Sequence, residues 1–277
     1  MNVLKRYFML FSSELLRFIP LEIAIPIAKF LGFLWYILTP RRREAIRENM
    51  RHIKGKFTEK DIRKLFINYA VDFVYFLKVP VMGKNEILSL IRTEGEEYIR
   101  DNLKRGVILV SAHLCNWEIM GSYFALKGYK LNAVAEMRGP GEGMFRFYKR
   151  YRGRFGVNIL PLEERKTWIR IKEALKNGEI VVLISDRDLS GTGIILPFFD
   201  SRASFPKGPA YFSIKTGSPI VCGFVRREGG RYTGYAHPPL EPEGETMESL
   251  TQKMVKILEQ EIGKYPEYWY VFQPVWK

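Results

Sequence analysis

The fold is decided by residues 107–118, whose sequence is VILVSAHLCNWE. The first four residues are apolar, mostly β-branched and preceded by a glycine, a pattern typical of a buried strand. Asn116 is a suitable N-cap for a helix over residues 117–126. The stretch therefore predicts a buried strand, a short loop that carries His113, and a helix whose first turn holds Glu118.

Outward from this stretch, short apolar runs alternate with helical patterns. Such alternation indicates an α/β fold with a mostly parallel central sheet flanked by helices. The Gly- and Pro-rich residues 191–209 are predicted to form a loop in which Phe198 and Phe199 line an apolar channel. We expect strands at residues 130–135, 156–160, 180–185, 220–226 and 231–236, and helices at 84–104, 145–155, 168–176, 210–216 and 247–265.

Charged or titratable residues follow three of the predicted strands. His113, Arg138 and the run Asp186-Arg187-Asp188 each come at the carboxyl end of a strand. Because the carboxyl ends of parallel strands meet at one edge of a sheet, where ligands bind, we expect these residues to share a site.

His113 and Glu118 are the strongest catalytic candidates. A carboxylate can orient an imidazole and stabilise the imidazolium that forms when the ring accepts a proton. The other two histidines lie in a charged helix and in a proline-rich loop. A structural role for His113 stays open as the alternative to catalysis. For Cys115, the alternatives are a nucleophilic thiol and a small buried apolar residue. The sequence has neither the ligand spacing of a metal site nor a glycine-rich phosphate loop.

The composition points to an anionic partner. The chain has 277 residues, of which 47% are hydrophobic and 14% aromatic, and its net charge is +14. Such a surplus is typical of proteins that bind nucleic acid, anionic lipid or a phosphorylated substrate. No nucleic-acid-binding motif is present, so we expect a membrane surface as partner and no nucleic acid.

Residues 1–40 are apolar and aromatic, and we predict that they form a membrane-associating segment in front of a catalytic domain at 41–277. Residues 18–38 are about long enough to cross a bilayer, yet two charged residues and two prolines interrupt them. A helix lying in the interface and a pair of ordinary core helices are the alternatives. The three arginines at 41–43 favour contact with anionic headgroups.

At these motifs the chain resembles the bacterial late acyltransferases of lipid A biosynthesis, within the lysophospholipid/glycerolipid acyltransferase superfamily. The superfamily hallmark is His-x4-Asp/Glu, here His113 to Glu118. The resemblance runs in order over nearly the whole chain: the apolar N-terminus with the arginines at 41–43, the turn at Arg138, the arginine-rich stretch ending at 155–156, residues 185–188, 197–199 and 205–208, and the closing Pro-Glu-Tyr-Trp at 266–269.

The resemblance implies acyl transfer at a membrane without a metal, a cofactor or a covalent acyl-enzyme. His113 would deprotonate a hydroxyl of a lipid A precursor-like glycolipid, Glu118 would orient the imidazole, and the alkoxide would attack the thioester of acyl carrier protein or coenzyme A. The expected location is the inner (cytoplasmic) membrane, with the catalytic domain on the cytoplasmic side. Candidate contacts to substrate, phosphate or carrier are Asn116, Arg138, Arg154, Asp186, Arg187 and Lys207.

The acceptor lipid stays open at this point. The lipid A branch often has a glutamine where this chain has Arg187, and the same branch includes enzymes that acylate glycolipids such as phosphatidylinositol mannosides. A lysophospholipid acyltransferase and a non-enzymatic basic lipid-binding protein are the competing hypotheses. Acyl chain length would follow from the depth of the apolar channel.

Overall fold

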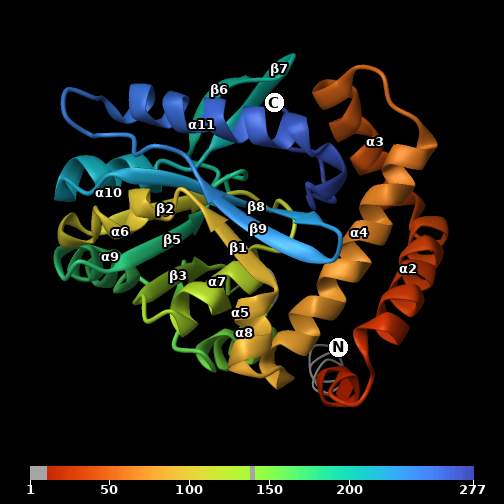
Figure 1. Cartoon of the computed structure of the whole chain (residues 1–277). Helices are drawn as coiled ribbons and strands as arrows, with labels where there is room; N and C mark the ends of the chain where they lie inside the picture. Colours follow the sequence, from red (N-terminus) through yellow and green to blue (C-terminus); the bar gives the residue numbers. More distant parts are fainter. Residues whose placement is uncertain (1–10, 138–140) are drawn as a thin grey trace.

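The computed structural model describes residues 11–137 and 141–277 and has an α/β fold (Figure 1). Within these residues, seven strands form one sheet in the order β1-β9-β8-β2-β5-β3-β4. Neighbouring strands are parallel except β8 and β9, which confirms the predicted mostly parallel sheet. The strands of the sheet are β1 (Ile91–Glu94), β2 (Val107–Ser111), β3 (Leu131–Ala135), β4 (Asn158–Pro161), β5 (Ile180–Ile184), β8 (Ile220–Glu228) and β9 (Arg231–Ala236).

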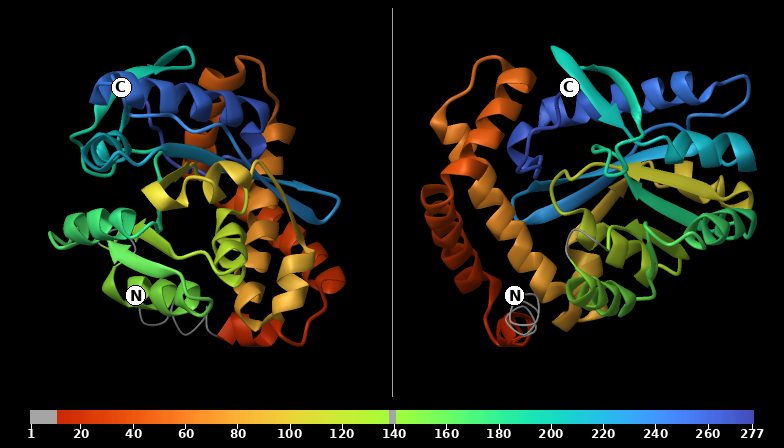
Figure 2. Two further views of the ribbon diagram at one scale, coloured as in Figure 1. Left: turned by 60° about the vertical axis from the view of Figure 1, so that its left-hand side comes forward. Right: turned by 180° about the vertical axis from the view of Figure 1, so that it is seen from behind.

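Helices cover both faces of the sheet (Figures 1 and 2). Because successive strand residues point to opposite faces, β2 divides the core in two. Ile108 and Val110 pack in one cluster with residues of α9, α10 and α11, whereas Val107 and Leu109 pack with residues of α4, α7 and α8. The helices are α2 (Leu21–Leu38), α3 (Pro40–Lys54), α4 (Glu59–Lys78), α5 (Lys84–Ser89), α6 (Glu97–Arg100), α7 (Trp117–Leu126), α8 (Glu142–Gly153), α9 (Thr167–Lys176), α10 (Gly208–Thr216) and α11 (Met247–Lys264).

Two predicted elements were wrong. Residues 84–104 form α5, β1 and α6 instead of one helix, and β1 is an edge strand that pairs in parallel with β9. Its exposed Arg92 and Glu94 make it look like part of a charged helix, because an edge strand tolerates charge that a central strand does not. The predicted loop at 191–209 contains an antiparallel hairpin, β6 (Ile194–Phe198) and β7 (Ser201–Phe205).

The helices α2, α3 and α4 form a layer along one side of the molecule (Figure 2). Helix α2 buries a row of small residues at four-residue spacing, Ala24, Ala28 and Gly32. A Cβ on Gly32 would lie 2.9 Å from atoms of α4, so glycine permits this close approach. The opposite face of α2 exposes large apolar side chains: Ile23, Ile27, Phe30, Leu31, Ile37 and Leu38.

By length and composition, α2 is the one helix of the described residues that is long and apolar enough to cross a membrane. This is weak evidence for membrane association, since core helices and signal sequences share these properties. Helix α2 packs along α4, which belongs to the predicted catalytic domain. The division into residues 1–40 and 41–277 stays a prediction.

Candidate active site

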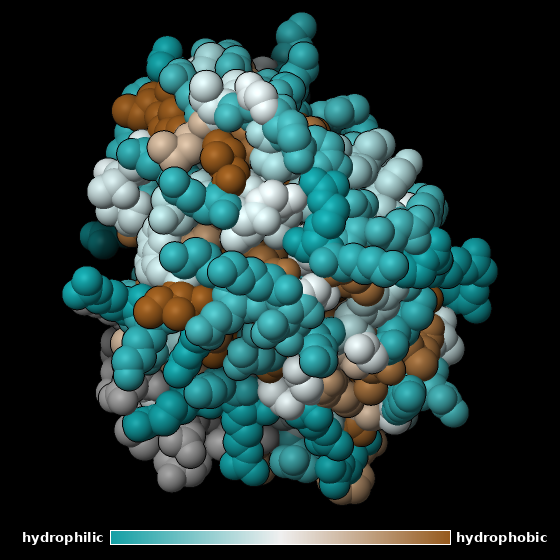
Figure 3. All heavy atoms as spheres, turned by 90° about the vertical axis from the view of Figure 1, so that its left-hand side faces the viewer, coloured by the Kyte–Doolittle hydropathy of each residue, from teal (hydrophilic) through white to brown (hydrophobic). Residues whose placement is uncertain are grey.

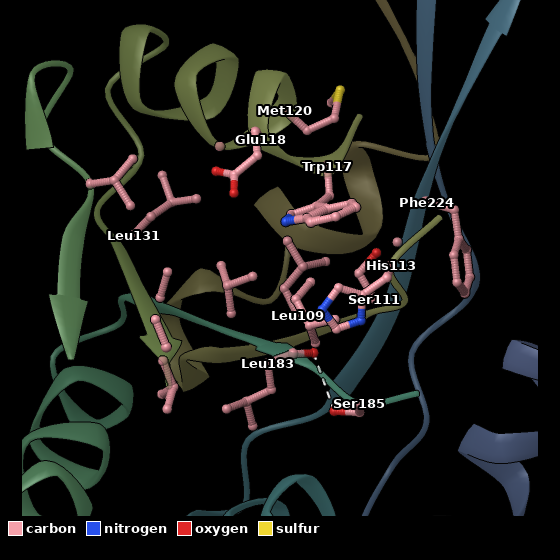
Figure 4. Close-up of a pocket in the computed structure, with 18 of the residues that line it drawn as sticks. Leu109, Ser111, His113, Trp117, Glu118, Met120, Leu131, Leu183, Ser185 and Phe224 are labelled. Carbon is pink, nitrogen blue, oxygen red and sulfur yellow. Dashed lines mark hydrogen bonds between the residues drawn. The ribbon is translucent and has the colours of Figure 1, made fainter. Parts of the chain in front are cut away.

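A cavity of about 670 Å³ lies between α7 and the sheet (Figure 4). Apolar side chains line much of its wall, among them Leu109, Leu131 and Leu183 from three neighbouring strands. His113 lies at one side of this cavity, at the carboxyl end of β2 (Figure 4). The site therefore joins an apolar space to a titratable group at the edge where parallel strands present ligand groups.

The loop that carries His113 is held by the C-terminal tail. The Tyr270 backbone N–H donates to the His113 carbonyl oxygen at 2.8 Å, and the Cys115 N–H donates to the Tyr268 carbonyl oxygen at 2.8 Å. Cys115 has a φ of +53°, a conformation that side chains other than glycine rarely adopt. The tail therefore fixes a strained backbone directly beside the histidine.

Asp186, which follows β5, is the hydrogen-bonding partner of His113. Its Oδ1 lies 2.7 Å from His113 Nδ1, and its Oδ2 accepts from the His113 backbone N–H at 3.0 Å. Trp269 Nε1 also donates to Oδ2, at 2.7 Å. Because an ionised carboxylate only accepts hydrogen bonds, this arrangement places the imidazole proton on Nδ1 and leaves Nε2 free to accept one.

Asp186 is buried, with 2% of its surface exposed. Burial on its own would raise the pKa of this carboxyl, but the facing imidazole of His113 and the N–H groups around it hold the pKa below its usual value. The carboxylate is therefore ionised at neutral pH and can stabilise an imidazolium on His113.

Glu118 does not orient His113 as predicted. Its side chain forms an ion pair with Arg152 of α8, whose Nε donates to Oε2 at 2.8 Å. In Figure 4 its carboxylate points toward the Leu131 side of the cavity and away from His113. The first turn of α7 aims this residue at α8, and the role of orienting carboxylate falls to Asp186.

The profile of the family described as bacterial lipid A biosynthesis acyltransferase matches residues 2–277. The chain belongs to this family. It is therefore an acyltransferase of the lipid and glycolipid class, which implies a lipid acceptor and an acyl donor. The resemblance found in the sequence motifs is confirmed at family level.

The chain is similar to proteins named phosphatidylinositol mannoside acyltransferase. The protein from Mycolicibacterium smegmatis is 27% identical over 244 residues, which are 84% of this chain and 79% of that protein. The protein from Mycobacterium tuberculosis is 29% identical over 173 residues, which are 62% of this chain and 54% of that protein.

Among solved structures, the crystal structure of the 1-acyl-sn-glycerophosphate acyltransferase PlsC from Thermotoga maritima is similar at 19% identity and a TM-score of 0.41. The match covers 86% of this chain and 97% of that one. A similarity at this level adds nothing to the assignment of function.

Three further candidate residues line the cavity, namely Asn116, Arg187 and Lys207. Arg154 is exposed, does not line the cavity and lies over the ring of Phe155. Arg138 lies outside the described residues. Arg187, which follows β5, and Lys207, which precedes α10, therefore lie at one site, whereas Arg154 lies elsewhere.

Asn116 is the N-cap predicted for α7, whereas Phe198 and Phe199 do not line an apolar channel as predicted. The Asn116 side chain accepts from the Ile119 N–H at 3.2 Å as the N-cap of α7, and its amide donates inside the protein. Phe198 is fully buried on the far side of the sheet, and neither phenylalanine lines the cavity. The hairpin of β6 and β7 turns them toward that core.

Sequence reasoning missed Asp72 of α4, which is buried against the His113 loop. Cys115 Sγ lies 3.6 Å from Asp72 Oδ2, and Tyr232 and Tyr270 donate their hydroxyls to the same carboxyl group. Burial raises the pKa of Asp72, and it raises the pKa of the Cys115 thiol well above its usual value. A thiol held neutral in this way argues against a nucleophilic role for Cys115.

Among the described residues, no group of three or more His, Cys, Asp or Glu side chains is placed to hold a metal ion. The expectation that no metal or cofactor takes part stays a prediction.

Proposed function

We propose that this acyltransferase moves a fatty acyl group from a thioester to a hydroxyl of a glycolipid, with His113 as general base. The observation that carries the proposal is the bond between His113 Nδ1 and the buried Asp186, which leaves Nε2 free beside an apolar cavity. The names of the relatives support a glycolipid acceptor of the phosphatidylinositol mannoside kind over a lipid A precursor or a lysophospholipid.

In the proposed reaction, His113 Nε2 accepts the proton of the acceptor hydroxyl. At the same time, the oxygen of this hydroxyl attacks the carbonyl carbon of the thioester. Asp186 stabilises the imidazolium that results. The tetrahedral oxyanion forms beside the N-terminus of α7, where backbone N–H groups favour negative charge. The intermediate then collapses: the carbon–sulfur bond breaks, and the imidazolium returns its proton to the leaving thiolate.

The cavity under α7 would hold the acyl chain. Its volume of about 670 Å³ lies within the range of pockets that enclose small ligands. Leu109, Leu131 and Ala133 line it from the sheet, and Phe145 lines it from α8. The donor would be a thioester of acyl carrier protein or of coenzyme A, and no cofactor enters the scheme.

We place the membrane on the side of α2. The exposed apolar face of this helix would lie in the interface, with the arginines at 41–43 next to anionic headgroups. The face around α6, α9 and α10 differs, because it is largely hydrophilic and its hydrophobic side chains lie in separate small groups (Figure 3). The expected location is the cytoplasmic side of the inner membrane.

The test is acyl transfer by the detergent-solubilised full chain. Labelled acyl carrier protein and coenzyme A thioesters are offered with mannosylated phosphoinositides, lipid A precursors and lysophospholipids. We expect transfer to a mannosylated lipid, and a loss of about 10²–10⁴-fold in His113→Ala, the usual contribution of a general base. His52→Ala is the matched control, because His52 lies outside the cavity and bonds to Asp200. Equal activity of His113→Ala and wild type would refute the role of the base.

A further inference from the structure

Asp72 of α4 is a buried carboxylate that the reaction proposed above does not use. It is 5% exposed and accepts hydrogen bonds from the hydroxyls of Tyr232 and Tyr270. Arg227 of β8 forms an ion pair with it, with 3.2 Å between Arg227 Nε and Asp72 Oδ1. Taking a carboxylate out of water costs free energy even when the carboxylate is paired, so a buried ion pair is weak evidence of a stabilising role.

The other partners of Asp72 belong to the loop of His113 and to the tail that holds this loop. Cys115 Sγ donates to Asp72 Oδ2 at 3.6 Å, and the Asn116 side-chain amide donates to the Asp72 carbonyl oxygen at 3.2 Å. Tyr270, whose hydroxyl donates to the same Oδ2, also donates its backbone N–H to the His113 carbonyl oxygen at 2.8 Å. One residue of α4 therefore bonds to the loop directly and to the tail residue that is bonded to the histidine.

The backbone between these contacts is strained. Cys115 has a φ of +53°, and a residue other than glycine keeps such a conformation only where its surroundings fix it. The tail fixes the Cys115 backbone N–H, whereas Asp72 fixes the Cys115 thiol and the residue that follows. Loss of Asp72 would let this strain relax and would turn the loop away from its present direction. A catalytic group misplaced by about 1 Å can lose about 10²-fold in rate.

We propose that Asp72 is a positioning residue for acyl transfer, which holds the His113 loop through Cys115 and Tyr270 so that the base faces the cavity. Helix α7 begins at Trp117, directly after the loop residues that Asp72 bonds, so the same contacts fix the helix N-terminus beside which the oxyanion would form. The inference rests on the acyl transfer proposed above and adds to it a residue of α4, a helix that packs with another face against α2.

Two tyrosines provide a matched pair of variants. Tyr232→Phe and Tyr270→Phe each remove one buried hydroxyl that donates to Asp72, but Tyr232 lies on β9, whereas Tyr270 bonds to His113. The Asn116 amide also donates to the Tyr232 hydroxyl, at 3.4 Å, and keeps its bond to the Asp72 carbonyl oxygen when that hydroxyl is removed. The two variants therefore differ mainly in whether the tail is released from Asp72.

Asp72→Asn is the third variant, with nearly the same shape as wild type. The oxygen that remains stays beside Arg227, because an NH₂ group there would face another donor. The NH₂ group then takes the place of Oδ2, so the Tyr270 hydroxyl and the Cys115 thiol lose their acceptor. For these variants and for Asp72→Asn/Tyr270→Phe, kcat and KM of acyl transfer are measured together with the free energy of unfolding.

We expect the two tyrosine variants to lose similar amounts of stability. In Tyr270→Phe and in Asp72→Asn, kcat should fall about 10-fold or more with little change in KM, whereas in Tyr232→Phe it should stay within about 3-fold of wild type. Because both changes break one connection, the double variant should lose no more than the more affected single variant. Equal kcat in the two tyrosine variants, a loss through KM, or additive losses in the double variant would overturn the proposal.

Amide hydrogen exchange tests the positioning without any acyl transfer. The Tyr270 N–H bonds to the His113 carbonyl oxygen, and the Cys115 N–H bonds to the Tyr268 carbonyl oxygen. We expect both amides to exchange about 10-fold faster or more in Asp72→Asn and Tyr270→Phe, relative to amides of β2 that report global unfolding, and not in Tyr232→Phe. This result supports the positioning role even if no transfer is found. Unchanged relative exchange in Asp72→Asn and Tyr270→Phe overturns it even if transfer proceeds.

Discussion

Replacing Asp186 with asparagine tests which carboxylate controls His113. Asp186 uses its two oxygens differently: Oδ1 faces His113 Nδ1, whereas Oδ2 accepts from the His113 N–H and from Trp269 Nε1. If the asparagine turned its NH₂ group toward these two N–H donors, neither donor would have an acceptor. The cost would be about 1–3 kcal/mol for each of them. The side chain of Asp186→Asn therefore keeps its oxygen there and turns its NH₂ toward the imidazole.

This orientation reverses the tautomer of His113. An NH₂ group facing Nδ1 donates to it, so the imidazole proton moves to Nε2, the atom that has to accept a proton from the acceptor hydroxyl. The corresponding change in a serine protease lowers kcat about 10⁴-fold for the same reason. We expect kcat of Asp186→Asn to fall about 10³–10⁴-fold, equivalent to roughly 4–5.5 kcal/mol of transition-state stabilisation, with little change in KM.

The assay follows release of the thiol from the donor at saturating acceptor, together with nitrogen NMR of the His113 ring, which reports the tautomer. Asp200→Asn is the matched control, because Asp200 faces Nδ1 of another histidine, His52, outside the cavity. The reasoning is refuted if Asp186→Asn retains activity within about 10-fold of wild type, or if its imidazole keeps the proton on Nδ1.

Four other predictions follow from the contacts. Trp269→Phe removes one donor to Asp186 and should lower kcat about 10-fold with little change in KM, in the same assay. Glu118→Gln and Arg152→Gln should each lower the free energy of unfolding by about 1–3 kcal/mol, and the double variant by no more than either, in denaturant titrations. Burial would raise the pKa of Glu261, but bonds from His237, Lys264 and Tyr235 lower it to about 2. Glu261 therefore contributes its full stabilisation above its ordinary pKa of 4.5 and loses it as the pH falls toward 2. In denaturant titrations at a series of pH values, the free energy of unfolding should fall over this range by roughly 3 kcal/mol in wild type and by much less in Glu261→Gln. Ala133→Phe narrows the cavity and should lower kcat/KM for a sixteen-carbon donor relative to a ten-carbon donor about 10-fold, because exclusion of about two methylenes forfeits about 0.8 kcal/mol each.

Local patterns predicted much of the fold because they depend on near neighbours in the chain. The helix over Trp117–Leu126 and its N-cap at Asn116 were predicted to the residue. Edge strand β1 was missed because its charged side chains face solvent, and the hairpin of β6 and β7 was missed because glycine and proline hid its alternating burial. Buried Trp269 and Asp72 act on the His113 loop from distant parts of the chain, and no local pattern marks such contacts.

The sequence by itself determined the strand–loop–helix around His113 and membership of an acyltransferase family. Only the tertiary structure decided which carboxylate meets the histidine. Strand β5 pairs in parallel with β2, Ile184 beside Ser111, so that Asp186, two residues beyond the end of β5, arrives opposite His113. Glu118 is close in sequence but turns on its helix toward Arg152. Partners 73 residues apart are chosen by sheet register, which depends on the packing of both faces of the sheet.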